Sequence, residues 1–307
     1  MTRYILTRLL AAAVVMLGVA TVVFLLMHLI PGDPVDVMLG EGANPADRAE
    51  LRRQLGLDRP LLGQWLHYLG RLLYLDLGIG IHSREPVAQL LMQRIPATLA
   101  LAAAAFLASL CIAFPLGILA AVYRNSVADR IAMLFSVAGV SIPNFWLGPL
   151  LILLFSYWLG WLPVSGMQGW SSLILPALTL GTALAALQSR MIRASLLEVL
   201  GEDYIRAARA RGLGEATVIL QHGLRNALLP VVTILGIQLG ALLTGAVVTE
   251  FIFDWPGVGR LIIDAIHRRD YPVVQACVLF ISAVYVLVNL VTDILSTGLD
   301  PRMRLEA

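Results

Sequence analysis

Lysine does not occur anywhere in the 307 residues, so all 22 basic side chains are arginines. A P-loop nucleotide site uses a lysine to reach the phosphates. The absence of lysine therefore excludes such a site in this chain, and any ATP that drives its function must bind to another subunit. Charge is also scarce, because only 14% of the residues are charged and the formal net charge is +2. So small a net charge does not indicate a nucleic-acid partner.

Only two cysteines are present, Cys111 and Cys277, and both lie inside apolar runs far apart in the sequence. No C-x-x-C spacing occurs, so neither a disulfide framework nor a cysteine metal site is supported. The patterns H-E-x-x-H and G-x-S-x-G are also absent, which argues against a membrane-embedded enzyme. We therefore expect a chain that is not an enzyme and binds no metal or cofactor itself.

Apolar sequence is abundant, because 59% of the residues are hydrophobic. A soluble domain of this length could not bury so much apolar surface, whereas a membrane helix needs roughly 20 apolar residues. The first run, Leu9–Ile30, is too long for a signal-peptide core and is followed by no cleavage site, so we expect a retained helix. Five more spans are expected, at Ala97–Val122, at two places within Ile131–Ser189, at Ala227–Thr249 and at Pro272–Thr292.

Within the uncharged stretch Ile131–Ser189, the turn at residues 163–166 divides two helices, and Pro143 and Pro149 should bend the first of them. Six crossings place both termini on one side. The short segments there (1–8, 123–130, 190–226 and 299–307) hold 12 arginines, and those opposite (160–172 and 250–271) hold three. Arginine is enriched in cytoplasmic loops, so both termini are predicted to be cytoplasmic. The segment 31–96 holds seven arginines, but long loops translocate largely regardless of charge.

The predicted fold class is therefore an all-α membrane protein with six transmembrane helices in one domain. It comprises a first helix (1–30), a long periplasmic loop (31–96), a five-helix core (97–298) with a cytoplasmic loop (190–226), and a cytoplasmic tail (299–307). In the periplasmic loop, Pro31-Gly32-Asp33-Pro34 should end the first helix. An apolar stripe around Trp65 and Leu69 predicts a helix lying in the outer interface. This loop either covers the outer mouth or docks a soluble partner.

The cytoplasmic loop contains an alanine-rich helix, in which Glu202 and Arg206 are expected to pair at i and i+4. Gly212 should stop this helix, and a second helical stretch, Glu215–Arg225, returns to the membrane. Small side chains leave one face nearly flat, so another protein can approach it closely. A solvated hairpin is the alternative interpretation.

At this loop the sequence resembles a known family. Arg206-Ala207-Ala208, three residues, Gly212, nine residues and His222-Gly223-Leu224-Arg225 are similar to the E-A-A-x3-G-x9-I-x-L-P loop of ABC-importer permeases. Arg206 replaces the glutamate, and His222 and Arg225 replace the isoleucine and proline, as in the first permease subunit of the dipeptide/oligopeptide/nickel branch. Further matching segments lie along the chain: Pro31-Gly32-Asp33-Pro34, Leu55-Gly56-Leu57-Asp58-Arg59-Pro60, Ser141-Ile142-Pro143-Asn144-Phe145-Trp146, Trp255-Pro256-Gly257-Val258-Gly259-Arg260, Arg269-Asp270-Tyr271-Pro272-Val273 and Asp300-Pro301-Arg302.

The resemblance implies a subunit of a binding-protein-dependent importer in a bacterial inner membrane. Such a subunit forms the translocation path with a second, related permease chain, and two P-loop ATPases carry ATP and Mg. A periplasmic or extracellular binding protein delivers the substrate. Short peptides are the expected cargo, with glutathione or a nickel chelate as alternatives. The coupling loop that grips the ATPases is expected to use Glu202, Tyr204, Arg206, Ala207, Ala208, Arg211, Gly212, Leu213 and His222.

Polar groups within the expected spans are few. His28, Glu250 and Asp293 lie near span ends and are interpreted as interfacial residues. The lack of ionisable groups at mid-span argues against the main alternative function, an ion-coupled secondary transporter. More central polar residues could line a path or, as we favour, bond helix to helix: Asn144, Gln188, Gln238 and Asn289.

Gly236 and Gly240 form a G-x-x-x-G pair in the expected fifth helix. Small residues at this spacing let two helices pack closely. The pair marks either the seam with the second permease chain or packing within this chain.

Overall fold

The computed structural model describes residues 2–29, 35, 39, 44–54 and 57–299. Secondary structure in these ranges is helical apart from one isolated β-bridge, between Ile79 and Pro86. The helices are α1 (Thr2–Leu29), α3 (Pro45–Gln54), α4 (Leu61–Leu73), α5 (Val87–Val122), α6 (Val127–Ser141), α7 (Asn144–Leu151), α8 (Ser171–Leu200), α9 (Asp203–Ala210), α10 (Glu215–Thr217), α11 (Leu224–Ile252), α12 (Val258–His267) and α13 (Tyr271–Leu299). The π-helical segments Ile152–Trp158 and Val218–Gly223 follow α7 and α10.

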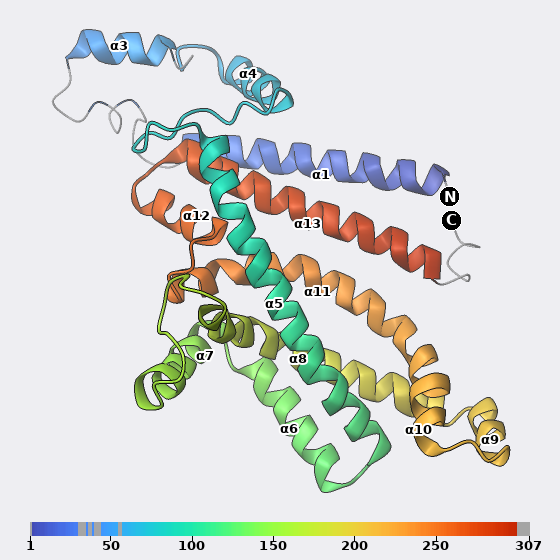
Figure 1. Ribbon diagram of the computed structural model, residues 1–307. Coiled ribbons are helices and arrows are strands. Elements are labelled where there is room, and N and C mark those ends of the chain that lie inside the picture. Colours follow the sequence, from blue (N-terminus) through green and yellow to red (C-terminus); the bar gives the residue numbers. More distant parts are fainter. Residues whose placement is uncertain (1, 30–34, 36–38, 40–43, 55–56, 300–307) are drawn as a thin grey trace.

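The long helices form a bundle whose two ends carry different small elements (Figure 1). Helix α1 lies along α13, which lies along α11, while α5 crosses the bundle over α8. Helices α3, α4, α7 and α12 gather at one end, called here the α4 end. The first turn of α1, the last turn of α13 and the short helix α9 lie at the opposite end, the α9 end. The start of α1 and the end of α13 are thus on one side, the arrangement expected for an even number of crossings.

Among the described residues, four helices are long and apolar enough to cross a membrane, and two bent pairs bring the count to as many as six. The continuous spans lie in α1, α5, α8 and α13. The first bent pair joins α6 to Asn144–Trp158 at 109°, so the expected third crossing is broken rather than continuous. Pro143 directly precedes α7, and its ring and missing N–H interrupt a helix. The bend predicted at this proline is confirmed.

The second bent pair joins Glu215–Leu228, which runs from α10 into the start of α11, to Pro230–Leu242 of α11 at 56°. Pro230 is inside this helix and supplies the cause of the bend, because it cannot donate to the carbonyl four residues before it.

Several boundaries differ from the sequence prediction. Helix α5 begins at Val87 rather than Ala97, because the helix continues through Arg94 and Pro96 although the apolar run does not. Helix α8 likewise continues past Arg190 to Leu200, and α12 was not predicted. The stripe around Trp65 is confirmed as a helix, α4. The predicted helix end at residues 31–34 and the tail after residue 299 lie outside the described residues.

The packing between α5 and α8 depends on small side chains. Buried residues recur on α5 at every fourth position, which places them on one face. A Cβ on Gly117 would lie 2.8 Å from Ile192, and a Cβ on Gly181 would lie 2.8 Å from the Ala105 carbonyl oxygen. Close approach of this kind maximises van der Waals contact in a membrane, where no hydrophobic effect drives helices together. The stripe consists of Ala97, Leu101, Ala105, Ser109, Ala113, Gly117 and Ala121.

Candidate coupling surface and buried polar sites

The segment after α8 folds into a helical hairpin, residues 203–223, at the α9 end (Figure 1). Glu202 precedes α9 in an extended conformation, with φ −71° and ψ 151°. Asp203 then places a carboxylate in the first turn, where the helix dipole favours it. Gly212 follows α9 with φ +79°, a conformation that costs glycine little. The predicted helix stop at Gly212 is confirmed.

Apolar contacts fasten the 203–223 hairpin to the end of α8. Ile205 and Val218 are completely buried, and Ala208 is 8% exposed. They pack against Val199 and Leu200 of α8, and burying each large side chain contributes about 1.5–3 kcal/mol. Ala208 therefore faces its own chain rather than the outer surface of α9. The hairpin and α8 should consequently move as one body.

Polar contacts close the hairpin on itself and onto the start of α11. Arg209 donates to the Glu215 carboxylate at 2.7 Å, across the turn at Gly212. The Asn226 amide donates to the Tyr204 hydroxyl at 2.7 Å, which joins α11 to α9. Exposed ion pairs contribute at most about 1 kcal/mol, so these contacts set the direction of the hairpin more than its stability.

Arg206 pairs with Asp203, three residues before it, and not with Glu202 as the sequence spacing suggested. The reason is that Glu202 lies outside the helix, where its extended backbone removes it from the i, i+4 position. The Arg206 side chain is still 70% exposed. Its guanidinium is thus available on the surface of α9.

Most of the sequence-predicted coupling residues are exposed on the surface of the hairpin. Tyr204 is 41% exposed and Leu213 is 39% exposed, and Leu220, which was not predicted, adds a further apolar side chain at 54%. His222 is half-buried in the π-helical segment. This surface combines apolar side chains with exposed arginines, as protein interfaces do. Its exposed predicted members are Glu202, Tyr204, Arg206, Ala207, Arg211, Gly212 and Leu213.

Two of the central polar residues join helices α8 and α11. Gln188 donates to the Gln238 side-chain oxygen at 2.7 Å. Gln188 is completely buried and Gln238 is 7% exposed. The bond gives a partner to the Gln188 amide nitrogen and to the Gln238 oxygen, whereas Gln188 Oε1 is buried with no hydrogen-bond partner among the described residues. Asn144 and Asn289 are not part of this pair. Asn144 begins α7 at the broken crossing, and Asn289 lies on α13 near Gly240.

The G-x-x-x-G pair of α11 packs within the chain, against α13. A Cβ on Gly236 would lie 2.0 Å from Thr292, and a Cβ on Gly240 would lie 3.2 Å from the Tyr285 ring. The sequence left open whether these glycines pack against the second permease chain or within this chain. In the structure they pack within this chain, between α11 and α13.

Glu250 is completely buried, so its interpretation as an interfacial residue was wrong. It lies near the end of α11, where Thr98 of α5 donates to Oε1 at 2.7 Å and the Arg260 N–H donates to Oε2 at 3.1 Å. The Val258 N–H donates in turn to the Thr98 hydroxyl at 2.8 Å. A carboxylate with such donors is held in place and joins α5, α11 and α12 at the α4 end. We call this arrangement the Glu250 cradle.

The segment Trp255–Arg260 is shaped around this carboxylate. A Cβ on Gly257 would lie 2.3 Å from both Glu250 oxygens, and a Cβ on Gly259 would lie 2.5 Å from the Val247 Cα. The Trp255 indole is buried and donates to the Ala97 carbonyl oxygen at 2.8 Å. The glycines at 257 and 259 are therefore required by close approach.

A partly buried ion pair joins α6 and α8 nearer the α9 end. Arg193 donates to both Asp129 oxygens, at 2.7 and 2.8 Å. Asp129 is 4% exposed and also accepts from the Asn125 N–H at 2.9 Å. A bidentate pair of this kind fixes orientation as well as distance. The turn between α5 and α6 is thereby fixed to α8.

Sequence reasoning missed the Glu250 cradle and the Asp129–Arg193 pair. Asp129 and Arg193 lie in different loops of the predicted topology, and no local pattern links them. A signal for the cradle was present, because Glu250 stands a few residues before two closely spaced glycines, Gly257 and Gly259. Glycines without a turn to explain them indicate close approach of another group.

The bundle of long apolar helices and the exposed 203–223 hairpin describe an all-α membrane protein. Residues 1–102 match the N-terminal family of binding-protein-dependent transport system membrane components. Residues 113–305 match the family described as binding-protein-dependent transport system inner membrane component. The chain therefore belongs to this family of ABC-importer permeases, of the dipeptide/oligopeptide/nickel type, and the resemblance seen in its motifs is confirmed. The family as a whole works with a partner permease, ATPases and a substrate-binding protein.

Curated relatives match almost end to end. The chain is 45% identical over 304 residues to the glutathione transport system permease protein GsiC of Escherichia coli (strain K12), with 99% of each chain covered. It is 46% identical, with the same coverage, to the GsiC protein of Salmonella typhimurium (strain LT2). Among solved structures, inward-facing conformations of the MetNI methionine ABC transporter share the fold, with a TM-score of 0.60 and 22% identity. That match covers 70% of this chain and 99% of the other.

Proposed function

We propose that this chain imports short peptides across the bacterial cytoplasmic membrane, as one of two related permease subunits that together form the path. Glutathione, a small anionic tripeptide, is the first cargo to test, because relatives 45–46% identical over the whole chain are glutathione permeases by name. Dipeptides and a nickel chelate are the competing cargoes. The match of family models along both halves of the chain is the observation that carries the importer function.

Energy is proposed to come from two partner ATPases that bind ATP and Mg and dock on the exposed side of the 203–223 hairpin. Two observations support this assignment. The chain has no lysine for a P-loop of its own, and the hairpin exposes Tyr204, Leu213 and Leu220 next to arginines. The arginine distribution favours a cytoplasmic α9 end, with the α4 end and its binding protein outside.

The proposed mechanism is alternating access. Closure of the ATPase dimer displaces the hairpin, which is fastened to α8 by buried Ile205 and to α11 by the Tyr204–Asn226 bond. Because α8 and α11 run from the α9 end toward the α4 end, a displacement at one end changes the path at the other. ATP binding and hydrolysis then bias two states of the path.

The test is uptake into proteoliposomes containing the chain with its co-purified subunits and binding protein. Labelled glutathione, a labelled dipeptide and a nickel chelate are compared, each with ATP, without ATP and with an uncoupler. ATP-dependent glutathione uptake that resists the uncoupler is expected. Preferential uptake of the nickel chelate would identify the chelate, and not glutathione, as the cargo. Uptake that needs no ATP and stops with the uncoupler would show that the protein is a secondary carrier and not an ATP-driven importer.

Gly212→Val should abolish transport while the chain still inserts into the membrane. A β-branched residue at φ +79° costs about 1–3 kcal/mol, and relaxing that strain redirects the hairpin. Gly212→Asn is the matched control, because asparagine tolerates this conformation and the space beside a Cβ is open. Normal uptake by the valine variant would show that the geometry of the hairpin does not transmit the motion.

Arg206→Ala should weaken binding of the ATPases, because its exposed guanidinium lies on the proposed docking surface. A loss of roughly 5- to 20-fold in affinity corresponds to one interface charge. Arg130→Ala, an exposed arginine of α6 away from the hairpin, is the control. Equal co-purification of the ATPases with both variants would remove Arg206 from the docking surface.

A further inference from the structure

One side of α11 is uncovered along the whole helix. Helix α11 contacts α5, α7, α8, α12 and α13, and it lies between α13 and α8 in the bundle (Figure 1). From Asn226 onwards, exposed residues nevertheless recur every three or four positions, a spacing that places them on one side of a helix. We call this side the open face of α11. It consists of Asn226, Pro230, Thr233, Ile237, Ala241, Thr244, Val248 and Phe251.

Two threonines of the open face have hydroxyls without a partner. Neither Thr233 nor Thr244 forms a hydrogen bond within the described part of the chain. A threonine hydroxyl in a helix can donate to the carbonyl oxygen four residues before it. Thr182 of α8 and Thr292 of α13 do so, at 2.6 and 2.8 Å. The open face therefore presents two hydroxyls that are free to bind another molecule.

Polar side chains of two neighbouring helices border the open face. At 100° per residue, Gly240 and Gly245 lie on either side of it. A Cβ on Gly240 would lie 3.2 Å from the Tyr285 ring and 3.7 Å from the Asn289 amide nitrogen, both on α13. A Cβ on Gly245 would lie 3.9 Å from the amide nitrogen of Asn144 on α7. Among the described residues, neither asparagine has a hydrogen-bond partner for its side chain.

This surface differs from a lipid-facing one. The exposed residues of α1 between Leu9 and Leu26 are all apolar, as a helix surrounded by acyl chains requires. Polar side chains within a membrane instead face other protein or a water-filled space. Thr233 and Thr244 lie about 16 Å apart along the helix axis. A closely packed helix would need a matching group at each of these levels, whereas water and a polar cargo can satisfy all of them.

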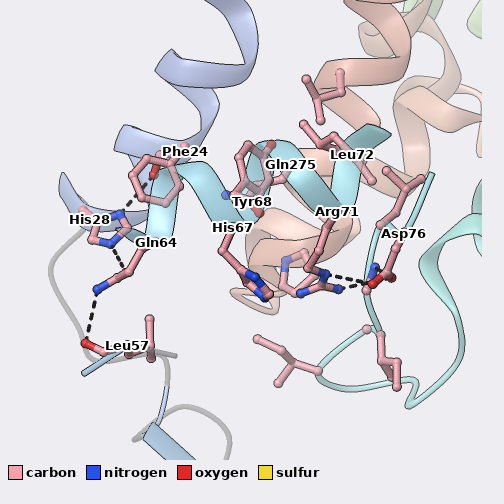
Figure 2. Close-up of a pocket in the computed structure, with 18 of the residues that line it drawn as sticks. Phe24, His28, Leu57, Gln64, His67, Tyr68, Arg71, Leu72, Asp76 and Gln275 are labelled. Atoms are coloured by element: carbon pink, nitrogen blue, oxygen red, sulfur yellow. Dashed lines mark hydrogen bonds and ion pairs between the residues drawn. The ribbon is translucent and has the colours of Figure 1, made fainter. Parts of the chain in front are cut away.

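A cavity at the α4 end is separate from the open face. Its volume is about 650 Å³, and Figure 2 shows Phe24 and His28 of α1 beside Gln64 and Tyr68 of α4 at this cavity. None of its described lining residues belongs to α7 or α11. The unpartnered hydroxyls and amides therefore do not lie in this cavity.

We propose that the open face of α11 lines the translocation path, where its two hydroxyls and the amides of Asn144 and Asn289 bind the amide groups of a peptide cargo. Hydroxyls and carboxamides both donate and accept hydrogen bonds, as a peptide backbone does. The open face carries no charged side chain, so it selects for amide groups rather than for net charge. This inference rests on the proposed importer function and adds the residues that contact the cargo.

The first test asks whether water reaches the open face. Thr233→Cys, Thr244→Cys and Asn289→Cys are made singly, and the complex in proteoliposomes is treated with a positively charged methanethiosulfonate. Thiols react as thiolates, which form in contact with water. Each variant should react at least about tenfold faster than the wild type. The wild type is the control, because its own thiols are Cys111, on the exposed side of α5, and buried Cys277.

The second test measures uptake by Thr233→Val and Thr244→Val, which remove a hydroxyl and keep the shape of the side chain. Each should lower uptake of labelled glutathione or a labelled dipeptide about three- to tenfold, as expected for one lost hydrogen bond. Melting temperature and co-purification of the ATPases should not change, because neither hydroxyl has a bond within the described chain. Thr182→Val is the matched control, since its hydroxyl bonds within α8, and it should transport normally.

Absence of labelling at all three cysteine positions would overturn the proposal, because lipid or a packed helix would then cover the open face. Labelling together with unchanged uptake by both valine variants would also overturn it, because the hydroxyls would then line water without binding cargo. A wild-type complex that takes up neither peptide would refute the proposed function instead. The labelling would still decide whether the open face lines a water-filled path.

Discussion

Replacing Gly257 with alanine tests the physical reason for the Glu250 cradle. The new Cβ would lie 2.3 Å from both carboxylate oxygens of Glu250, far inside van der Waals contact. The backbone itself accepts alanine, since φ at this residue is −100°. The cost therefore comes from steric overlap, and overpacking of this kind destabilises by about 1–3 kcal/mol.

Glu250→Ala should also destabilise the protein when made alone. It removes the acceptor of the Thr98 hydroxyl and of the Arg260 N–H. A buried donor left without a partner costs about 1–3 kcal/mol. In the double variant, however, the alanine methyl at position 257 occupies space that the carboxylate has left. The double variant should then be no less stable than Glu250→Ala alone, which gives a coupling energy of about 1–3 kcal/mol.

Gly181→Ala is the matched control for this cycle. Its Cβ would lie 2.8 Å from the Ala105 carbonyl oxygen, a backbone atom that Glu250→Ala does not remove. Unfolding free energies are measured by titrating the bicelle-embedded chain with SDS and following near-UV circular dichroism. Rescue of the Gly257 variant but not of the Gly181 variant is expected. Strict additivity at Gly257 would refute the reasoning, because the two side chains would then not compete for the same space.

Two further substitutions test how the helices are joined. Arg193→Ala should destabilise the protein by about 1.5–3 kcal/mol, since Asp129 loses its bidentate partner and keeps the Asn125 N–H; a change below about 0.5 kcal/mol in the same titration would show that solvent replaces Arg193 at that carboxylate. Gly236→Val should cost about 1–3 kcal/mol by overlap with Thr292, and Thr292→Ala should recover part of it. Absence of recovery would contradict the contact between α11 and α13 at this position.

Features with a local cause could be predicted from the sequence. The stop at Gly212 follows from one residue and its neighbours, and the bend at Pro143 follows from the chemistry of proline. The helix α4 followed from the spacing of its apolar residues. The start of α5 at Val87 could not be predicted in this way. Hydropathy shows which residues lie in the bilayer, but a helix can extend beyond the bilayer into polar sequence.

Features that depend on contacts between distant residues could not be predicted. Thr98 and Glu250 are separated by 152 positions, so composition alone made Glu250 look like an ordinary residue near a span end. The choice between two partners for Gly236 also required the position of α13. For Glu250 and for Gly236, the sequence identified a charged or a small residue but could not identify the residue that it contacts.

On the proposed mechanism, the polar contacts decide which helices can move independently. The hairpin fastens α8 at the α9 end, the Gln188–Gln238 bond joins α8 to α11 near their middle, and the cradle joins α11 to α5 beyond it. A displacement of the hairpin should therefore move these three helices together and carry the cradle with them. By contrast, the crossing that is broken before Asn144 is not a continuous helix, so we do not expect it to move with the other three.

Spin labels at exposed Leu107 of α5 and Leu220 of the hairpin should accordingly keep their separation during the ATP cycle. Labels at Leu220 and Tyr157 should change their separation. Constant separation for both pairs would mean that the motion lies between the two permease chains and not within this one.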